Sequence, residues 1–116
     1  MNPTVSVQIV TYNSESDIEA CLCAVMKQTY PIHEIIVIDN NSQDETVSKV
    51  RAFSNVQLFL NQQNTGFAPA HNQAMQMTDT DYVLVLNPDV QLHDTYIGEI
   101  IAALERDSCI GMATGK

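Results

Sequence analysis

Hydrophobic and polar positions follow two alternating patterns along the chain. Runs rich in Val, Ile and Leu are typical of strands, and they occur at 5–11, 33–39, 56–60 and 81–87. The stretches between them carry apolar residues at helical intervals, which predicts helices over about 15–28, 42–53, 68–77 and from 94 onward. We expect a further strand at 108–113.

This alternation of strands and helices with short connections predicts an α/β fold. The simplest architecture is a doubly wound, mainly parallel sheet of four to five strands flanked by helices, since parallel neighbours need helical crossovers. With 116 residues, of which 45% are hydrophobic, the chain can build one core. We therefore expect a single domain over residues 1–116.

Local signals suggest where the helices begin. Ser14 precedes Asp17 by three residues, and Ser42 precedes Glu45 by the same spacing, so both serines are predicted to cap a helix. Pro69 suits the first turn of the third helix.

Polar clusters follow each predicted strand. Because the carboxyl ends of parallel strands meet at one edge of the sheet, these clusters should converge there: Tyr12-Asn13, Asp39-Asn40-Asn41, the segment 61–66 and Asn87-Pro88-Asp89. The last cluster follows four apolar residues, Val83 to Leu86, which predict a strand buried on both faces. We interpret Asp89 as the residue that holds a metal ion against a nucleotide diphosphate.

Charge narrows the possible partners. The chain carries 14 acidic and 5 basic residues, a formal net charge of −9, which argues against nucleic acid or an anionic membrane surface as the main partner. The basic residues lie outside the polar clusters, at Lys27, Lys49, Arg51, Arg106 and Lys116. A bound diphosphate would therefore depend on a metal ion, on helix N-termini or on residues beyond this chain.

Cysteines and apolar segments suggest a cytoplasmic setting. Cys21, Cys23 and Cys109 lack paired metal-ligand spacing and are expected to be reduced residues that pack in the interior. No apolar run reaches the roughly 20 residues that cross a bilayer, and residues 1–4 lack the basic start of a signal peptide.

Several familiar nucleotide-binding signatures are absent. The sequence contains neither GxGxxG after its first strand nor GxxxxGK[ST], which argues against dinucleotide oxidoreductases and P-loop enzymes. A nucleotidyltransferase would require a basic, glycine-rich first loop, and a phosphoacceptor receiver domain would require acids where Thr11-Tyr12-Asn13 stands.

Five motifs in order resemble one family. They are VTYNSE at 10–15, QTYP at 28–31, EIIVIDNNSQDET at 34–46, NTGFAPAHN at 64–72 and YVLVLNPDV at 82–90. Together they are similar to the inverting nucleotide-sugar glycosyltransferases of family 2 with the GT-A fold, especially the rhamnosyltransferase-like branch. The resemblance covers nearly the whole chain and implies its N-terminal, donor-binding part.

The resemblance assigns roles to particular residues. Thr11, Tyr12 and Asn13 would surround the base and ribose, and Asp39 would accept a hydrogen bond from the pyrimidine imide. The alternative for Asp39 is that it only caps the turn before Ser42.

The later motifs supply the rest of the expected site. The nucleotide would also contact Asn64, Gly66, Asn72 and Asn87, and Asp89 would bind the metal. The alternative for Asp89 is a loop-capping role. His71 is either a phosphate contact or, the interpretation that we favour, a histidine at the surface or core edge, and the sequence offers no partner for it.

The implied reaction transfers a rhamnose-like sugar, with inversion, from a dTDP- or UDP-linked donor to a saccharide or lipid-linked acceptor hydroxyl. The metal would be Mg²⁺ or Mn²⁺, bound weakly without nucleotide, because Asn87 replaces the first acid of the family's DxD pattern. The general base would lie beyond Lys116. We therefore expect a truncated enzyme, cytoplasmic or peripheral to the inner face of the membrane in its full-length form.

A second hypothesis from a different class is a non-catalytic module that binds a nucleotide or a protein at the same polar edge. An exposed sheet edge could also lead to self-association. Neither arrangement needs a general base.

Overall fold

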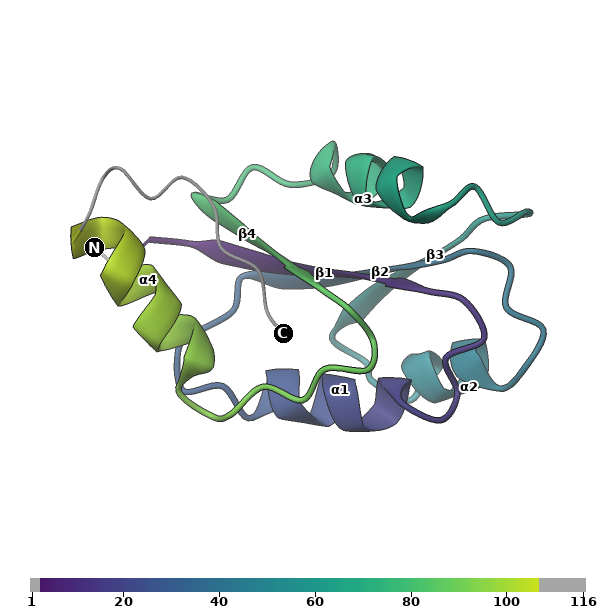
Figure 1. The fold of residues 1–116 in the computed structure, drawn as a ribbon, viewed down its shortest axis with the longest axis horizontal. Coiled ribbons are helices and arrows are strands. Elements are labelled where there is room, and N and C mark those ends of the chain that lie inside the picture. The colour runs from purple at the N-terminus through teal and green to yellow at the C-terminus, as the bar shows by residue number, and fades with distance from the viewer. Residues whose placement is uncertain (1–2, 107–116) are drawn as a thin grey trace.

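A computed structural model describes residues 3–106, which form four strands and four helices (Figure 1). The strands are β1 (Val5–Thr11), β2 (Glu34–Asp39), β3 (Val56–Leu60) and β4 (Tyr82–Leu86). The helices are α1 (Ile18–Met26), α2 (Thr46–Arg51), α3 (Phe67–Met75) and α4 (Tyr96–Arg106). No helix within residues 3–106 is long and apolar enough to cross a membrane.

All four strands are parallel and lie in the order β3-β2-β1-β4. The chain builds the sheet outward from β1 to β3 and then returns to add β4 on the other side of β1. Thr11 pairs with Asp39, and Ile9 pairs with Leu86, so the ends of β1, β2 and β4 share one edge. This order places a topological switch point between β1 and β4, which is where open α/β sheets bind ligands.

The reversal of direction also decides which face each helix covers. Because parallel crossovers are right-handed, helices that connect strands added in opposite directions pack on opposite faces. Figure 1 shows α1, α2 and α4 on one face and α3 on the other. The prediction of a doubly wound α/β sheet flanked by helices is confirmed.

The two faces have different cores. The larger core lies between the sheet and α1, α2 and α4, and it contains Val7, Ile9, Leu22, Val37 and Ile97 among other residues. The smaller core is formed by Val10, Ile36 and Ile38 of the sheet with Ala70 and Ala74 of α3. The short alanine side chains allow α3 to lie close to β1 and β2.

The predicted strands agree with the observed ones to within a residue at each end, but two helix starts are wrong. α1 begins at Ile18 and α2 at Thr46, and neither has a side-chain cap from the predicted serine. The Ser14 hydroxyl instead bonds within its own loop to the Tyr12 carbonyl oxygen, and the Ser42 hydroxyl donates to Asp39. Because both serine hydroxyls bond within the loops at the sheet edge, neither caps a helix, and each helix starts further along the chain.

β4 also differs from its prediction. Leu84 and Leu86 are buried, but Val83 and Val85 on the opposite face are only half-buried. The physical reason is that β4 lies at the edge of the described sheet, and α3 crosses β1 and β2 rather than β4. The strand expected at 108–113 lies outside the described residues.

Candidate functional site

The Asp39 carboxylate joins the ends of β1 and β2. Thr11 Oγ1 donates to Oδ1 at 2.7 Å, Ser42 Oγ donates to the same oxygen at 2.6 Å, and the Ser42 backbone N–H donates to Oδ2 at 2.8 Å. Asp39 is 2% exposed and Thr11 is fully buried. Three of the roughly four acceptor positions of a carboxylate are therefore filled from within the protein, and Asp39 does cap the turn before Ser42.

Asn13 fastens the loop after β1 to the loop after β2. Its backbone N–H donates to Ser42 Oγ at 2.8 Å, and its side-chain oxygen accepts from the Gln43 N–H at 2.8 Å. Asn13 has φ +48°, in the left-handed region that asparagine tolerates. These bonds leave Tyr12 at the tip of the loop, where its side chain is 50% exposed.

Asn40 is a site residue that sequence reasoning did not single out. It is 2% exposed, its Nδ2 donates to the Gly66 carbonyl oxygen at 3.0 Å, and its Oδ1 accepts from Asn61 at 2.9 Å. Asn40 thereby holds the 61–66 loop against the end of β2. Its position directly after Asp39 was the sequence signal that could have identified it. Its role could not be predicted, because its partners lie more than twenty positions further along the chain.

Gly66 sets the start of α3. It has φ +91° and ψ 171°, a conformation available essentially only to glycine, and its N–H donates to Asn64 Oδ1 at 2.9 Å. α3 follows immediately at Phe67, one residue earlier than predicted. Asn64 and Gly66 thus lie together, whereas Asn72 is exposed on α3 and its side chain makes no hydrogen bond to them within the described residues.

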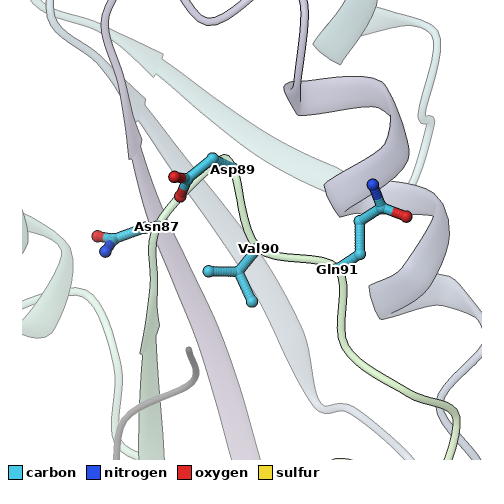
Figure 2. A pocket seen from close by; sticks show the side chains of 4 residues that line it. All are labelled: Asn87, Asp89, Val90 and Gln91. Carbon is cyan, nitrogen blue, oxygen red and sulfur yellow. The ribbon is translucent and has the colours of Figure 1, made fainter.

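The turn after β4 holds the remaining predicted residues. The Val90 N–H donates to the Asn87 carbonyl oxygen at 3.1 Å, which closes a turn around Pro88 and Asp89. Asn87, Asp89, Val90 and Gln91 line an open cavity of about 420 Å³. Figure 2 shows the Asp89 carboxylate and the Asn87 amide projecting from one side of this turn, with Gln91 directed away from them.

The donor atoms of this turn suit a hard cation but do not complete its coordination. Asp89 and Asn87 are both exposed and offer oxygen ligands, which Mg²⁺ and Mn²⁺ prefer. Within residues 3–106, however, no group of three or more His, Cys, Asp or Glu side chains could hold a metal ion. Phosphate oxygens of a ligand would have to supply further coordination.

The Cys21 thiol of α1 and the Lys27 side chain, which follows α1, lie near this loop. Burial, together with the negative charges of Asp89 and then Asp17, raises the pKa of the Cys21 thiol to about 12. Cys21 is therefore a neutral thiol, and its Sγ lies 3.8 Å from the Asn87 carbonyl oxygen. Lys27 lines a second cavity of about 340 Å³ together with Gln91 and Asp94, so one cation does lie beside this loop.

Of the two described cysteines, one agrees with the prediction of packing residues and one does not. Cys21 is buried, but Cys23 is exposed and lines the second cavity. The two residues point to different sides of α1, as their spacing requires. Cys109 lies outside the described residues.

His71 is a core-edge residue of α3, and it does have a partner. Gln8 Nε2 lies 2.9 Å from His71 Nδ1 and donates to the His71 carbonyl oxygen at 3.1 Å. Because this amide nitrogen is a donor, Nδ1 accepts and the proton of neutral His71 is on Nε2. Burial lowers the pKa of His71, which favours the neutral form.

Comparison with known proteins identifies one family. Residues 6–114 match the model of Glycosyl transferase family 2. Glycosyltransferase AglE of Haloferax volcanii is 34% identical over 101 residues, which cover 82% of this chain and 33% of that protein. The Escherichia coli UDP-Glc:alpha-D-GlcNAc-diphosphoundecaprenol beta-1,3-glucosyltransferase WfgD is 36% identical over 87 residues, which cover 73% of this chain and 34% of that protein.

Solved structures agree with this match. S. aureus TarS in complex with UDP superposes with a TM-score of 0.81 at 26% identity, covering 89% of this chain and 32% of that chain. The mannosyltransferase PcManGT from Pyrobaculum calidifontis, in complex with GDP-Man and Mn²⁺, superposes with a TM-score of 0.73 at 29% identity, covering 87% and 32%. The chain thus spans about one third of the length of the relatives that it matches.

Proposed function

This chain belongs to glycosyl transferase family 2, and from that premise we propose that it is the donor-binding part of an enzyme that transfers a sugar, with inversion, from a nucleotide diphosphate sugar to an acceptor hydroxyl. The observation that carries this proposal is the switch point between β1 and β4. It lies between a polar platform at Thr11, Asn13 and Asp39 and the exposed turn at Asn87 and Asp89.

We assign the nucleoside to the platform. The base and ribose would lie over Thr11, Tyr12 and Asn13, with half-exposed Tyr12 offering a ring for stacking. Asp39 would orient the platform through its three internal bonds and use its one remaining acceptor position for the pyrimidine imide. This double role differs from the simpler one expected from sequence.

We assign the diphosphate and sugar to the other two loops. Asn64, Gly66 and Asn72 would border the ligand near the N-terminus of α3, whose free backbone N–H groups favour negative charge. Asn87 and Asp89 would hold a divalent ion, Mg²⁺ or Mn²⁺, which when bound offsets charge on the departing nucleoside diphosphate. Because Asp89 is the one carboxylate of this turn, it would bind the ion weakly by itself. The nucleotide would in turn need the ion to offset repulsion from a chain of net charge −9, so we expect the ion and the nucleotide to bind together.

The donor would be a pyrimidine nucleotide sugar, UDP- or dTDP-linked. WfgD is a UDP-Glc-dependent glucosyltransferase and TarS binds UDP, which supports a pyrimidine for this chain, whereas PcManGT binds GDP-Man and is the contrary case that a titration with GDP tests. A rhamnose-like sugar and a saccharide or lipid-linked acceptor follow from the motif resemblance. The general base is proposed to belong to a segment beyond Lys116, since this chain corresponds to about one third of its relatives.

Replacing the metal-binding carboxylate tests this function. Calorimetric titration of the chain with UDP, dTDP and GDP, with Mn²⁺ and with EDTA, should show tighter pyrimidine nucleotide binding when Mn²⁺ is present. Asp89→Ala should reduce the Mn²⁺-dependent gain by about 10–100-fold, as expected when a metal ligand or its support is lost.

Asp81→Ala is the matched control. It removes the same charge from the opposite end of β4, where the carboxylate accepts from the Thr4 N–H. UDP affinity should be unchanged in this variant. Nucleotide binding that depends on neither Mn²⁺ nor Asp89 would contradict the proposal and favour the non-catalytic module.

A further inference from the structure

The loop that carries Asp89 is fastened at its start to α1 and at its end to the connection that follows α1. At its start the Cys21 thiol lies 3.8 Å from the Asn87 carbonyl oxygen, and further along Leu92 is 6% exposed in the same core cluster as Cys21 and Val25. At its end the Thr29 N–H donates to the Asp94 carbonyl oxygen at 2.9 Å. Exposed Asp89 lies on the stretch between these fastenings.

Gln28 makes the most extensive side-chain contacts at the second fastening. Its Nε2 donates to the His93 carbonyl oxygen at 2.7 Å and to the Ala24 carbonyl oxygen at 3.3 Å. Its Oε1 accepts from the Ile97 N–H at 3.0 Å. One side chain in the connection that follows α1 thus bonds the last part of the Asp89 loop and the first turn of α4.

These bonds add to the backbone bonding at the start of α4. Ile97 is in the first turn of α4, where N–H groups have no partner within the helix, and Gln28 Oε1 supplies one. The His93 carbonyl oxygen, which precedes α4, also accepts from the Tyr96 N–H at 3.1 Å and gains a second bond from Gln28 Nε2. An amide side chain can serve both groups, because it carries a donor and an acceptor. Neither Lys nor Met at this position could do so.

We propose that Gln28 is a positioning residue for the metal site, holding the Asp89 loop in the geometry that binds ion and diphosphate together. This inference rests on the proposed function and adds a residue to it that touches neither ligand. Its physical basis is preorganisation: a loop fastened at both ends loses less conformational freedom when its carboxylate engages a cation.

Gln28→Met tests the proposal, because methionine has a similar length but neither hydrogen-bonding group. The Mn²⁺-dependent gain in UDP affinity should fall about tenfold, in line with losses seen when groups that orient metal ligands are removed. UDP binding in EDTA, which depends on the platform at Thr11 and Asp39, should stay within about twofold of the unmodified chain. A residue that only stabilises the fold would not separate these two quantities.

Tyr30→Phe is the matched control. Tyr30 lies in the same connection, but its hydroxyl donates to the Pro3 carbonyl oxygen and not to the Asp89 loop. This variant should keep the full Mn²⁺-dependent gain. An equal loss in both variants would overturn the proposal, since it would indicate general destabilisation.

Hydrogen exchange separates this proposal from the proposed function. The Val90 N–H closes the Asp89 turn and is not a partner of Gln28, so its exchange rate reports on the loop. Exchange should accelerate at least about tenfold in Gln28→Met and remain unchanged in Tyr30→Phe. Unchanged Val90 exchange overturns the positioning role whether or not UDP binds, whereas failure of the unmodified chain to bind UDP with Mn²⁺ overturns the proposed function.

If Gln28→Met does not fold, Gln28→Glu provides the same comparison. Its carboxylate can still accept from the Ile97 N–H but cannot donate to His93. The Mn²⁺-dependent gain should again fall while binding in EDTA persists, and retention of the full gain would overturn the proposal.

Discussion

The Asp39 carboxylate has a structural role as well as a place in the proposed site. Three hydrogen bonds from Thr11 and Ser42 hold it while it is 2% exposed. Hydrogen bonds to a charged group contribute about 1.5–3 kcal/mol each, so this residue stabilises the edge on which the nucleoside is proposed to lie. Replacing it would therefore disturb both folding and binding, which is why Asp89 is the cleaner residue for testing function.

His71 should make the protein sensitive to acid. Burial lowers the pKa of His71 in the folded state, so the unfolded chain binds more protons below its own pKa of about 6.5. Stability contributed by neutral His71 is thus present above about pH 6.5 and is lost as the pH falls toward the folded-state pKa. Urea unfolding should show a lower free energy of unfolding at pH 5.5 than at pH 7.5.

His71→Asn should reduce this pH dependence, because asparagine can keep an acceptor near the position of Nδ1 without titrating. His93→Asn is the control, since the His93 side chain is 61% exposed and pairs with Glu99 at the surface. An unchanged pH dependence in His71→Asn would mean that another group is responsible. The test concerns stability and is independent of nucleotide binding.

At the scale of elements, the start of α3 depends on one glycine. The backbone of Gly66 has φ +91° and ψ 171°, and a Cβ at this position would meet only Pro69 Cδ, at 3.8 Å. The cost of a side chain is therefore backbone strain and not a clash. Gly66→Ala should lower the free energy of unfolding by about 1–3 kcal/mol in urea denaturation.

Gly98 provides a control of opposite sign. It lies inside α4, and a Cβ there would be in ordinary contact with Tyr30 at 3.8 Å. Gly98→Ala should raise the free energy of unfolding by about 0.5–1 kcal/mol, because alanine loses less backbone entropy in a helix. Equal effects of the two substitutions would contradict the assignment of strain to Gly66.

The helix starts also show how elements and site are coupled. α2 begins at Thr46, whose N–H and hydroxyl both donate to Asp44 Oδ1, at 3.0 and 2.5 Å. Ser42 Oγ donates to Asp39 in the loop after β2, and Thr46 Oγ1 accepts from the Ser14 N–H in the loop after β1 at 2.8 Å. A capping box at Ser42 would compete with the bonds that hold Asp39.

At the scale of the whole molecule, the charge of −9 should oppose a diphosphate ligand. Without metal, UDP affinity is therefore expected to rise about two- to threefold between 20 and 200 mM NaCl, as salt screens the repulsion. Calorimetric titration in EDTA measures this change. A nucleic-acid-binding protein shows the opposite trend, and a fall in UDP affinity with salt would contradict the expectation.

The sheet also ends at β3 on one side and β4 on the other within the described residues, with Phe59 and Leu60 of β3 exposed. Such edges can pair with another strand. We therefore propose that the chain can self-associate through these edges, and we expect the negative charge to weaken this association at low salt.

The order of strands and helices, and the convergence of polar loops at one edge, could be predicted from the sequence because they depend on local apolar periodicity and on the parallel geometry of crossovers. Asp39, Gly66 and Asp89 lie in those loops, whereas the roles of individual residues, that of Thr11 included, followed from the resemblance to the family. Sequence alone also favoured a position at the surface or the core edge for His71, but offered no partner for it.

Only the tertiary structure decided which side chains meet. Three pairs show this: Gln8 with His71, Asn40 with Gly66, and Gln28 with His93. Their members are 63, 26 and 65 positions apart, and they meet because the crossover connections of the sheet bring the chain back to the same place. Other bonds at the sheet edge, from the Ser14 N–H to Thr46 Oγ1 and from Ser42 Oγ to Asp39, involve the serines that were expected to cap α1 and α2. A hydrogen bond between distant residues leaves no periodic signal in the sequence, because its donor and acceptor are fixed by packing and not by spacing.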